Sequence, residues 1–366
     1  MRVVVFGLTI SSSWGNGHAT LWRGLVRALA RRGCSVVFFE RDLPYYATNR
    51  DLCEIAGGKL VLYAAWPDVA DRARREVASA DVAIVTSYCP DAIAATQLIS
   101  EAGAALRVFY DLDTPVTLSR IGGGEDVGYV GPRGLRDFDL VLSFVGGAAL
   151  SELEQRLGAR RVAALYGHVD PDVHRPVVPV AHYAADLSYL GTYAGDRQRT
   201  LHSLFIAPAA QCPERRFLIG GAQYPHDFPW SSNIYFVRHL PPAEHAAFFS
   251  SSRLTLNVTR AAMVRMGWCP SGRLFEAAAC GTAVLSDQWE GLSDFYREGS
   301  EILVARSAED VIGALDLADA EIGRIGGAAR ERTLAEHTSD RRAGQLIAIL
   351  ESARRRPDEH HEARVA

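Results

Sequence analysis

Residues 256–305 read LNVTRAAMVRMGWCPSGRLFEAAACGTAVLSDQWEGLSDFYREGSEILVA. Leu254–Val258 and Ala283–Ser286 are short apolar runs, which are typical of buried strands. The helical stretch Ser271–Ala279 lies between them and closes at Gly281, a residue type that commonly ends helices. A strand, a helix and a second strand in this order predict a parallel sheet with crossover helices.

The same alternation runs outward through the rest of the chain. Before residue 168 it predicts strands at Arg2–Gly7, Ser35–Glu40, Leu60–Ala64, Val82–Ser87, Leu106–Tyr110, Leu140–Phe144 and Arg161–Tyr166, with helices at Ala19–Arg32, Val69–Ala78 and Asp91–Glu101. After residue 185 it predicts strands at Leu187–Gly191, Arg216–Ile219, Ile234–Val237, Leu254–Val258, Ala283–Ser286 and Ile302–Val304. Helices are predicted there at Asp196–Ala210, Ala243–Ser250 and Ser271–Ala279, and two more helical stretches finish the chain.

A proline-rich stretch separates the two series. His168–Pro179 reads HVDPDVHRPVVP, and its three prolines favour an extended connector. We predict an N-terminal domain over 1–167, a hinge over 168–185, a C-terminal domain over 186–350 and a polar tail over 351–366. The predicted fold is α/β, with two Rossmann-like, doubly wound domains that face each other across an inter-domain cleft. Because such sheets bind ligands at the carboxyl ends of their strands, we expect the site in that cleft.

The composition excludes several kinds of chemistry. The formal net charge of −4 argues against a general nucleic-acid-binding surface, which is basic. The chain has a single lysine, Lys59, and Leu60 follows it where a P-loop needs serine or threonine. A lysine Schiff base would have to use this same residue. Any phosphate must therefore be held by arginine side chains and backbone N–H groups.

Cysteine spacing and hydropathy bear on the location of the protein. The six cysteines are scattered, with no C-x-x-C pair and no zinc-ligand spacing, which favours free thiols in a reducing compartment. The N-terminal MRVVVFGL is too short an apolar run for a signal peptide and is predicted to be a strand. No apolar run approaches the ~18 residues of a membrane span. We expect a cytoplasmic protein without a transmembrane segment.

The loop after the first strand, TISSSWGNGHATLWRG, is the first candidate site. Gly15, Asn16 and Gly17 lead into a helix, and backbone N–H groups at a helix start bind anions. His18 is either a substrate contact or a helix cap, and the whole loop could also hold no ligand. A dinucleotide site would use Glu40 for the ribose, but Thr20 replaces the third glycine of that fingerprint.

Two further candidate sites follow predicted strands. Asp111 and Asp113 lie at the carboxyl end of one strand, where a carboxylate can accept a proton from a hydroxyl or bind a sugar. The alternative is turn chemistry, because Asp113 precedes a Thr-Pro pair. In the second half, Thr192, Tyr193 and Arg197 surround a predicted helix start and fit phosphate contact. Here the alternative is that Arg197 is a solvated helix residue.

The opening stretch carries the most specific candidate site. Its first strand ends at Asn257, and Arg260 follows. Ser271 and Arg273 begin the helix, which makes an anion site from N–H groups, a hydroxyl and a guanidinium. Glu276 lies three residues beyond Arg273 on the same face of the helix. Its carboxylate can accept hydrogen bonds from both hydroxyls of a ribose there. The alternative is an ion pair between these two side chains.

FEAAACGTAVLSD resembles the signature region of GT-B glycosyltransferases, notably the retaining family-4-like group. With SSSWGNGHAT, YDLDTPVT, YLGTYAGDRQ, GGAQYP and LNVTRAAMV, the chain resembles more specifically the CgeB-like (spore maturation protein B-like) glycosyltransferases. The resemblance implies a nucleoside-diphosphate-sugar donor bound mainly by the C-terminal domain and an unidentified acceptor bound mainly by the N-terminal one. It implies no cofactor besides the donor and no metal.

The resemblance also implies roles for individual residues. Glu276 matches the glutamate that holds the donor ribose, Gly220 and Gly221 would line the base, and Leu274 lies within the same donor motif. Arg260, Ser271 and Arg273 would face the diphosphate and stabilise the leaving group, with Asp111 or Asp113 as the base if the enzyme inverts. Retaining relatives have an E-x7-E pattern whose first position is Trp268 here, which leaves the stereochemical outcome open.

Two other functions compete with glycosyl transfer. The first is a nucleotide-sugar epimerase or hydrolase on the same fold, which would release nucleoside diphosphate without an acceptor. The second is a catalytically degenerate protein that only binds sugar nucleotides, for which Trp268 is the main support.

Overall fold

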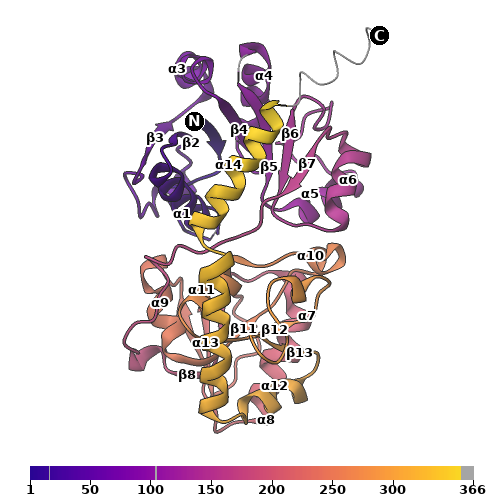
Figure 1. The fold of residues 1–366 in the computed structure, drawn as a ribbon. Helices are drawn as coiled ribbons and strands as arrows, with labels where there is room; N and C mark the ends of the chain where they lie inside the picture. Colours follow the sequence, from indigo (N-terminus) through magenta and orange to yellow (C-terminus); the bar gives the residue numbers. More distant parts are fainter. Residues whose placement is uncertain (16, 104, 356–366) are drawn as a thin grey trace. The chain divides into compact units, whose positions relative to one another are not determined.

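The computed structural model describes residues 1–15, 17–103 and 105–355 (Figure 1). The chain forms two compact units, Met1–Tyr166 with Ser339–Ala366 and Gly167–Thr338. Each unit contains its own parallel sheet and its own hydrophobic core. Among the described residues, no helix combines the length and the apolar character that crossing a membrane requires.

The first unit is built on a sheet of seven parallel strands. They are β1 (Arg2–Gly7), β2 (Ser35–Arg41), β3 (Gly58–Tyr63), β4 (Val82–Thr86), β5 (Leu106–Asp111), β6 (Leu140–Ser143) and β7 (Val162–Ala164), in the spatial order β3-β2-β1-β4-β5-β6-β7. The helices are α1 (His18–Arg31), α2 (Pro44–Ala47), α3 (Trp66–Ala78), α4 (Ala92–Ala102), α5 (Thr114–Gly122), α6 (Ala148–Leu157) and α14 (Ser339–Arg355).

Helix α14 changes the predicted domain division at its C-terminal end. We predicted a C-terminal domain that continues to residue 350, but the chain from Ser339 onward groups with the first unit. The reason is packing: Ala343, Leu346 and Leu350 of α14 are buried in the core of the first sheet, and α14 lies against α1 (Figure 1). The first unit is therefore built from both ends of the chain.

The second unit is built on a sheet of six parallel strands. They are β8 (Ala185–Leu190), β9 (Phe217–Gly221), β10 (Ile234–Arg238), β11 (Ser252–Asn257), β12 (Ala283–Asp287) and β13 (Leu303–Ala305), in the spatial order β10-β9-β8-β11-β12-β13. The helices are α7 (Gln198–Leu201), α8 (Ala207–Gln211), α9 (Pro242–Ser250), α10 (Ala261–Met266), α11 (Gly272–Ala279), α12 (Ala308–Leu315) and α13 (Asp319–Glu336), with a π-helical turn η3 (His202–Ile206) and short 3₁₀ turns η1 (Ala181–Tyr183), η2 (Gly195–Arg197) and η4 (Leu292–Asp294).

Both sheets have a point where the strand order reverses. In the first unit it lies between β1 and β4, and in the second between β8 and β11. Loops leave the carboxyl ends of the two strands in opposite directions at such a point, which opens a crevice where ligands bind. Most of the predicted site residues follow strands beside these two points.

Candidate functional site

Helix α11 carries the densest group of predicted donor residues. The Ser271 hydroxyl caps its first turn by accepting a hydrogen bond from the Arg273 N–H at 3.3 Å. The remaining N–H groups and the positive end of the helix dipole favour an anion here. Leu274 does not fit its predicted role, because its side chain is buried in the core and its N–H donates to the Ser271 carbonyl at 3.1 Å.

Two of the predicted arginines lie near one phenol, Tyr224. The Tyr224 hydroxyl donates to the carbonyl of Gly191, at the end of β8, at 3.1 Å. Burial raises the pKa of Tyr224, and the positive charges of Arg197 and Arg273 oppose that rise, so both guanidinium groups lie within electrostatic range of this side chain. The Nε atoms of both arginines are buried and have no hydrogen-bond partner among the described residues. Because an unsatisfied buried donor is unfavourable, both arginines are suited to an anionic ligand.

Arg260 differs from these two arginines because it has an internal partner. Its Nε donates to Asp196 at 3.0 Å, and both side chains are about 30% exposed. The segment before it is held from β12, since Asp287 accepts hydrogen bonds from the Thr259 N–H at 3.0 Å and the Thr259 hydroxyl at 2.9 Å. Burial raises the pKa of Asp287 to about 6. Asn257 is buried beside Thr259 and donates to its hydroxyl at 3.4 Å, so it helps to position this segment.

The predicted glycines bring the ends of β8 and β9 together. A Cβ atom on Gly221 would lie 2.0 Å from the carbonyl oxygen of Gly191, and one on Gly220 would lie 3.0 Å from a Leu190 methyl group. Thr192 follows directly, and its carbonyl accepts a hydrogen bond from Arg197 at 3.5 Å. The glycines thus permit the close packing that places Arg197 at this edge of the sheet.

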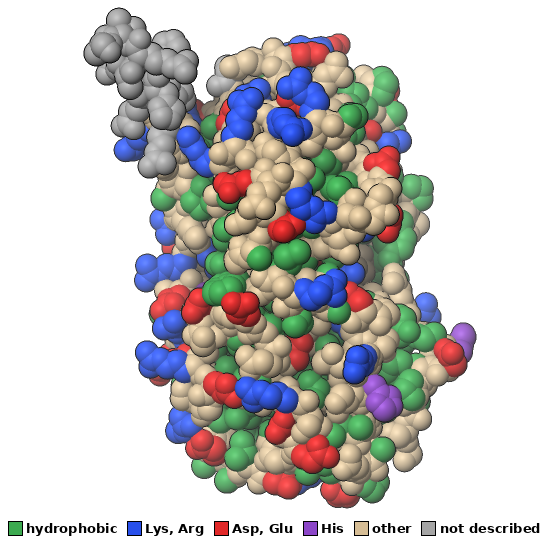
Figure 2. Space-filling model, turned by 90° about the vertical axis from the view of Figure 1, so that its right-hand side faces the viewer, with side chains coloured by type: hydrophobic (Ala, Val, Ile, Leu, Met, Phe, Trp, Pro, Cys, Tyr) green, Lys and Arg blue, Asp and Glu red, His purple; other side chains and the backbone are tan. Residues whose placement is uncertain are grey.

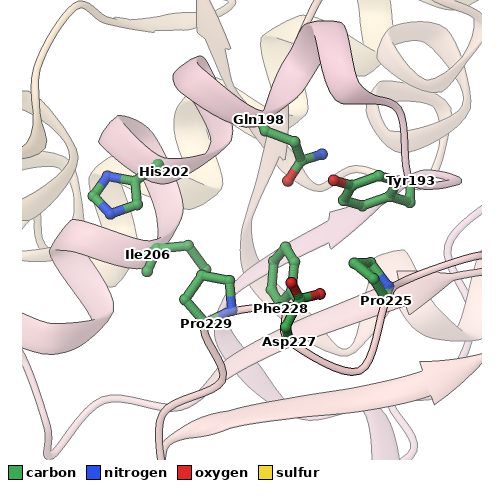
Figure 3. A pocket seen from close by; sticks show the side chains of 8 residues that line it. All are labelled: Tyr193, Gln198, His202, Ile206, Pro225, Asp227, Phe228 and Pro229. Carbon is green, nitrogen blue, oxygen red and sulfur yellow. The ribbon is translucent and has the colours of Figure 1, made fainter.

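Tyr193 lines a pocket of about 200 Å³ on the second unit (Figure 3). Its other walls come from Gln198, His202 and Ile206 on one side and from the loop that contains Pro225, Asp227, Phe228 and Pro229. Figure 3 shows the Gln198 amide pointing toward the Tyr193 hydroxyl across this pocket. The pocket combines flat apolar surfaces with polar groups, a mixture that suits a small polar ligand.

By the motif resemblance, Trp268 stands where retaining family-4-like glycosyltransferases carry a glutamate. Its backbone has a positive φ of 41°, and its indole N–H donates to Asp294 at 2.6 Å. The indole packs so tightly on Gly291 that a Cβ there would lie 2.6 Å from the ring. The side chain is therefore built into the fold and offers no carboxylate to a sugar.

Glu276 forms a buried cluster with His174 and His245, two residues that the sequence analysis did not single out. His174 Nε2 lies 3.5 Å from His245 Nδ1, which lies 3.6 Å from Glu276 Oε2. Burial lowers the pKa of His174 to about 4. Burial opposes ionisation of Glu276, but His174, His245 and Arg273 outweigh it and hold its pKa below the ordinary range. The separation of the two histidines along the chain left no spacing signal for this cluster.

In the first unit, the loop after β1 is held from below by Glu40. This fully buried carboxylate accepts hydrogen bonds from the Thr9 hydroxyl at 2.8 Å, the Ile10 N–H at 2.7 Å, and the Ser11 N–H and hydroxyl at 3.0 and 2.6 Å. All four bonds are internal. The structure therefore gives Glu40 a role in shaping the loop and leaves it unavailable for the ribose of a dinucleotide.

The glycines of this loop lie at its outer end. Gly15 has a positive φ of 67°, and a Cβ there would lie 2.9 Å from the Tyr45 hydroxyl. Gly17 is the residue before α1, and a Cβ on it would meet nothing within 4 Å. Asn16, which we also predicted as a donor contact, lies outside the described residues.

His18 and Asp113 come together above the first sheet. His18 Nε2 lies 3.9 Å from Asp113 Oδ2, and the two side chains are 15% and 21% exposed. Asp111 is fully buried and accepts hydrogen bonds from the Asp113 N–H and the Thr117 hydroxyl, both at 3.1 Å. Burial raises the pKa of Asp111 to about 6. The geometry favours Asp113 over Asp111 as a group that meets a substrate, because Asp111 is closed to solvent.

Comparisons with known proteins identify the fold. Residues 197–348 match the family described as glycosyl transferase-like. No curated protein matches the sequence. The matched segment makes up less than half of the chain, but it contains Arg197, Arg260, Ser271, Arg273 and Glu276. The predicted class of enzyme, a glycosyltransferase, is the class that this family describes.

Solved structures with the same architecture cover almost the whole chain. An alpha-glucosyltransferase in complex with UDP-glucose and DNA containing an abasic site has a TM-score of 0.70 at 12% identity, over 96% of this chain and 99% of that one. Sucrose-phosphate synthase from Thermosynechococcus elongatus has a TM-score of 0.67 at 14% identity, over 96% and 99%. HepE from Anabaena, in complex with UDP and glucose, has a TM-score of 0.66 at 11% identity, over 96% and 100%. These likenesses confirm the predicted GT-B fold of two Rossmann-like domains.

The surface charge agrees with the weakly acidic composition. Figure 2 shows arginine and acidic side chains intermixed over the face that it presents. A duplex-binding surface is instead dominated by positive charge.

Proposed function

We propose that this protein is a glycosyltransferase that moves a sugar from a nucleoside-diphosphate-sugar donor, bound by the second unit, to an acceptor bound by the first. The observation that carries this proposal is the pair Arg197 and Arg273. Both have buried, unsatisfied Nε donors, and both guanidinium groups act on Tyr224, while Arg273 itself lies in the first turn of α11. A diphosphate would satisfy these donors and place its developing charge next to a helix N-terminus.

Glu276 extends the donor site along α11. A Cβ on Gly272, at the start of this helix, would lie 3.9 Å from Glu276 Oε1, so this oxygen is on the side of the first turn. A ribose attached to a diphosphate at the helix start would bring its hydroxyls toward this carboxylate. Arginines and backbone N–H groups, and not a metal ion, would stabilise the leaving diphosphate in this proposal.

Asp113 and His18 are the proposed acceptor-side pair. If the enzyme inverts, Asp113 accepts the proton of the attacking hydroxyl, and His18 orients that carboxylate. Trp268 leaves the donor site without the extra glutamate of retaining relatives, which favours a mechanism that relies on an acceptor-side base. The motif resemblance supports the finer assignment to the CgeB-like group, and the scattered cysteines support a cytoplasmic location.

The experiment that tests the function is a release assay over a panel of nucleotide sugars. Uridine donors belong in the panel because similar folds were solved with UDP and UDP-glucose. Each nucleotide sugar is incubated with the protein, with and without a mixture of hydroxyl acceptors, and free nucleoside diphosphate is measured. We expect release from one donor that increases several-fold when acceptor is present.

Two other results would redirect the assignment. Release that is equally fast without acceptor would favour a nucleotide-sugar hydrolase. Saturable nucleotide binding with no turnover of any donor would favour the degenerate binding protein.

A further inference from the structure

We propose that His174, His245 and Glu276 form a binding site for a divalent transition-metal ion of the zinc type. The site itself is argued from these three residues alone. Only its effect on the donor rests on the proposed function, through the shared residue Glu276.

Three separate segments bring these side chains to one point of the second unit. His174 comes from the connector before β8, His245 from α9 and Glu276 from α11. Their ligand atoms all lie within 4.8 Å of one another, with neighbouring pairs at 3.5 and 3.6 Å. In a tetrahedral zinc site with bonds of about 2.0–2.2 Å, ligand atoms are about 3.3–3.6 Å apart. The observed pairs therefore match the edges of such a site.

Hydrogen bonding does not account for the cluster. The two distances are longer than ordinary hydrogen bonds, and one ring nitrogen, His245 Nδ1, faces both neighbours. A neutral imidazole nitrogen either donates or accepts, so it cannot serve both of them in the same tautomer. Glu276 Oε2 is buried and without a hydrogen-bond partner among the described residues. A cation between the three atoms would accept one lone pair from each of them.

The chemical nature of the three ligand side chains favours one class of metal ion. Two imidazoles and one carboxylate suit zinc and its neighbours in the first transition row, whereas magnesium and calcium prefer oxygen ligands. All three side chains are buried, at 1% exposure for His174, 6% for His245 and 5% for Glu276. Such burial strengthens metal coordination, because water competes less well for the ion.

The site has one opposing charge and one functional consequence. Arg273 acts on both Glu276 and His174 through space, so its guanidinium weakens the binding of a cation. In the proposed site the metal ion is coordinated by Oε2 of Glu276, while Oε1 lies on the side of Gly272. A bound ion would therefore fix the carboxylate that the proposed function assigns to the donor ribose, without contacting the diphosphate.

The test is a metal titration of the whole chain after treatment with a chelator. Co²⁺ is added and followed by its visible absorption, and Zn²⁺ is then used to displace it. We expect one Co²⁺ per chain, with the strong absorption of low-coordinate cobalt. His245→Gln and Glu276→Gln should each weaken binding at least about 100-fold, because a direct ligand matters more than the outer-shell groups that already change affinity 10–100-fold.

Two control variants separate this site from other histidines. His226→Ala removes an exposed histidine of the same unit, and the double variant His360→Ala/His361→Ala removes the adjacent pair in the C-terminal sequence. Both should bind Co²⁺ like the unchanged protein. Thermal unfolding of every variant without metal reports whether that variant is folded. If His245→Gln is unfolded, His174→Gln replaces it as the variant that lacks a histidine ligand.

The outcomes distinguish the metal site from the proposed function. Absence of saturable metal binding, or binding that survives His245→Gln and is lost in the double variant, overturns the metal site. Nucleoside-diphosphate binding is measured on the same chelated protein. If that binding is present without metal binding, the function stands alone, and if metal binds but no nucleotide does, the metal site stands alone.

Discussion

Arginine carries the positive charge at the proposed diphosphate site. The single lysine, Lys59, is exposed on β3 of the first unit and plays no part there. Arg197 and Arg273 instead present planar, permanently charged groups that can bind phosphate oxygens in pairs. Their unsatisfied Nε atoms make them better diphosphate ligands than Arg260, which already pairs with Asp196.

Arg273→Ala should lower kcat by about 100- to 1000-fold, because it removes a group that stabilises charge in the transition state. Arg273→Lys should recover only part of the rate, since an ammonium group cannot reproduce the paired contact. Steady-state kinetics check both variants. Arg265→Ala, which removes an exposed arginine of α10, should keep its rate, and an unchanged kcat in Arg273→Ala would remove this residue from the mechanism.

The buried carboxyl of Asp111 should appear in the pH dependence of stability. Its pKa is raised from 3.8 to about 6 in the folded protein, so the folded state holds a proton that the unfolded state has lost between about pH 4 and 6. The contribution of Asp111 to the free energy of unfolding should therefore fall as the pH rises through this window, by about 1.4 kcal/mol per unit of pKa shift.

Asp111→Asn should remove this contribution to the slope. The contribution of Asp287, whose pKa is also about 6, and the opposite contribution of His174, whose pKa is lowered to about 4, should remain. Urea unfolding at a series of pH values measures the slope. Asp71→Asn, at an exposed carboxylate, should leave it unchanged. A slope that is identical in Asp111→Asn and the unchanged protein would show that this carboxyl titrates normally.

At the scale of elements, the loop after β1 is the clearest case of a local structure held by one side chain. Glu40 satisfies backbone and hydroxyl groups of three successive loop residues. This explains why a run rich in serine and glycine can take one shape at the switch point of the first sheet. Asp51 adds to it by accepting hydrogen bonds from the Ser13 N–H and hydroxyl at 3.1 and 2.6 Å.

Glu40→Ala should destabilise the first unit by about 3 kcal/mol or more, because it leaves buried donors unsatisfied. It should also weaken any acceptor that binds beside this loop. Thermal unfolding and amide hydrogen exchange over residues 8–13 measure the two effects. Glu54→Ala, at an exposed glutamate, is the matched control, and equal stability of the two variants would contradict the anchoring role.

Strands were easier to predict than helices. All thirteen predicted strands are present. Strands of a parallel sheet are buried on both faces, so each one appears in the sequence as a short, nearly continuous apolar run. Helix α5 was not predicted, because the Thr-Pro pair at its start is also typical of a turn, although proline is well tolerated at a first helical turn. The predicted single helix Asp196–Ala210 is interrupted by the π-helical turn η3 just before Pro208, which lacks the N–H that a regular helix would use.

The candidate site was predictable where residues are close in sequence and less so where the fold brings them together. Ser271, Arg273 and Glu276 share one helix, so spacing alone placed them on one element. The burial of Asp111, Asn257 and Leu274 was not visible, because it depends on packing by distant segments. His174 and His245 were missed for the same reason, since the connector and α9 meet only in the folded unit.

At the scale of the whole molecule, the chain leaves the first unit once and returns to it. The second unit is inserted between Tyr166 and Ser339, and α14 completes the first core. Stability of the first unit therefore depends on a helix that follows the whole second unit in the sequence. The second unit has an independent core that includes Leu315 of α12.

Leu350→Ala should destabilise the first unit by about 2–5 kcal/mol through the lost burial and the cavity that remains. Hydrogen exchange should then increase in β1 and β2 while β8 and β11 keep their protection. Leu315→Ala should show the reverse pattern. Equal loss of protection in both sheets for either variant would mean that the two units do not unfold as separate cores.

Calorimetric titration of nucleoside diphosphates into the unchanged protein and into Arg273→Ala tests the central claim, the donor site of the second unit, most directly. The account predicts saturable one-to-one binding of at least one nucleoside diphosphate, weakened about tenfold or more in Arg273→Ala and unchanged in Arg265→Ala, since a charge-assisted pair contributes about 1.5–3 kcal/mol. The same affinity in Arg273→Ala, or no saturable binding of any nucleoside diphosphate, would contradict it.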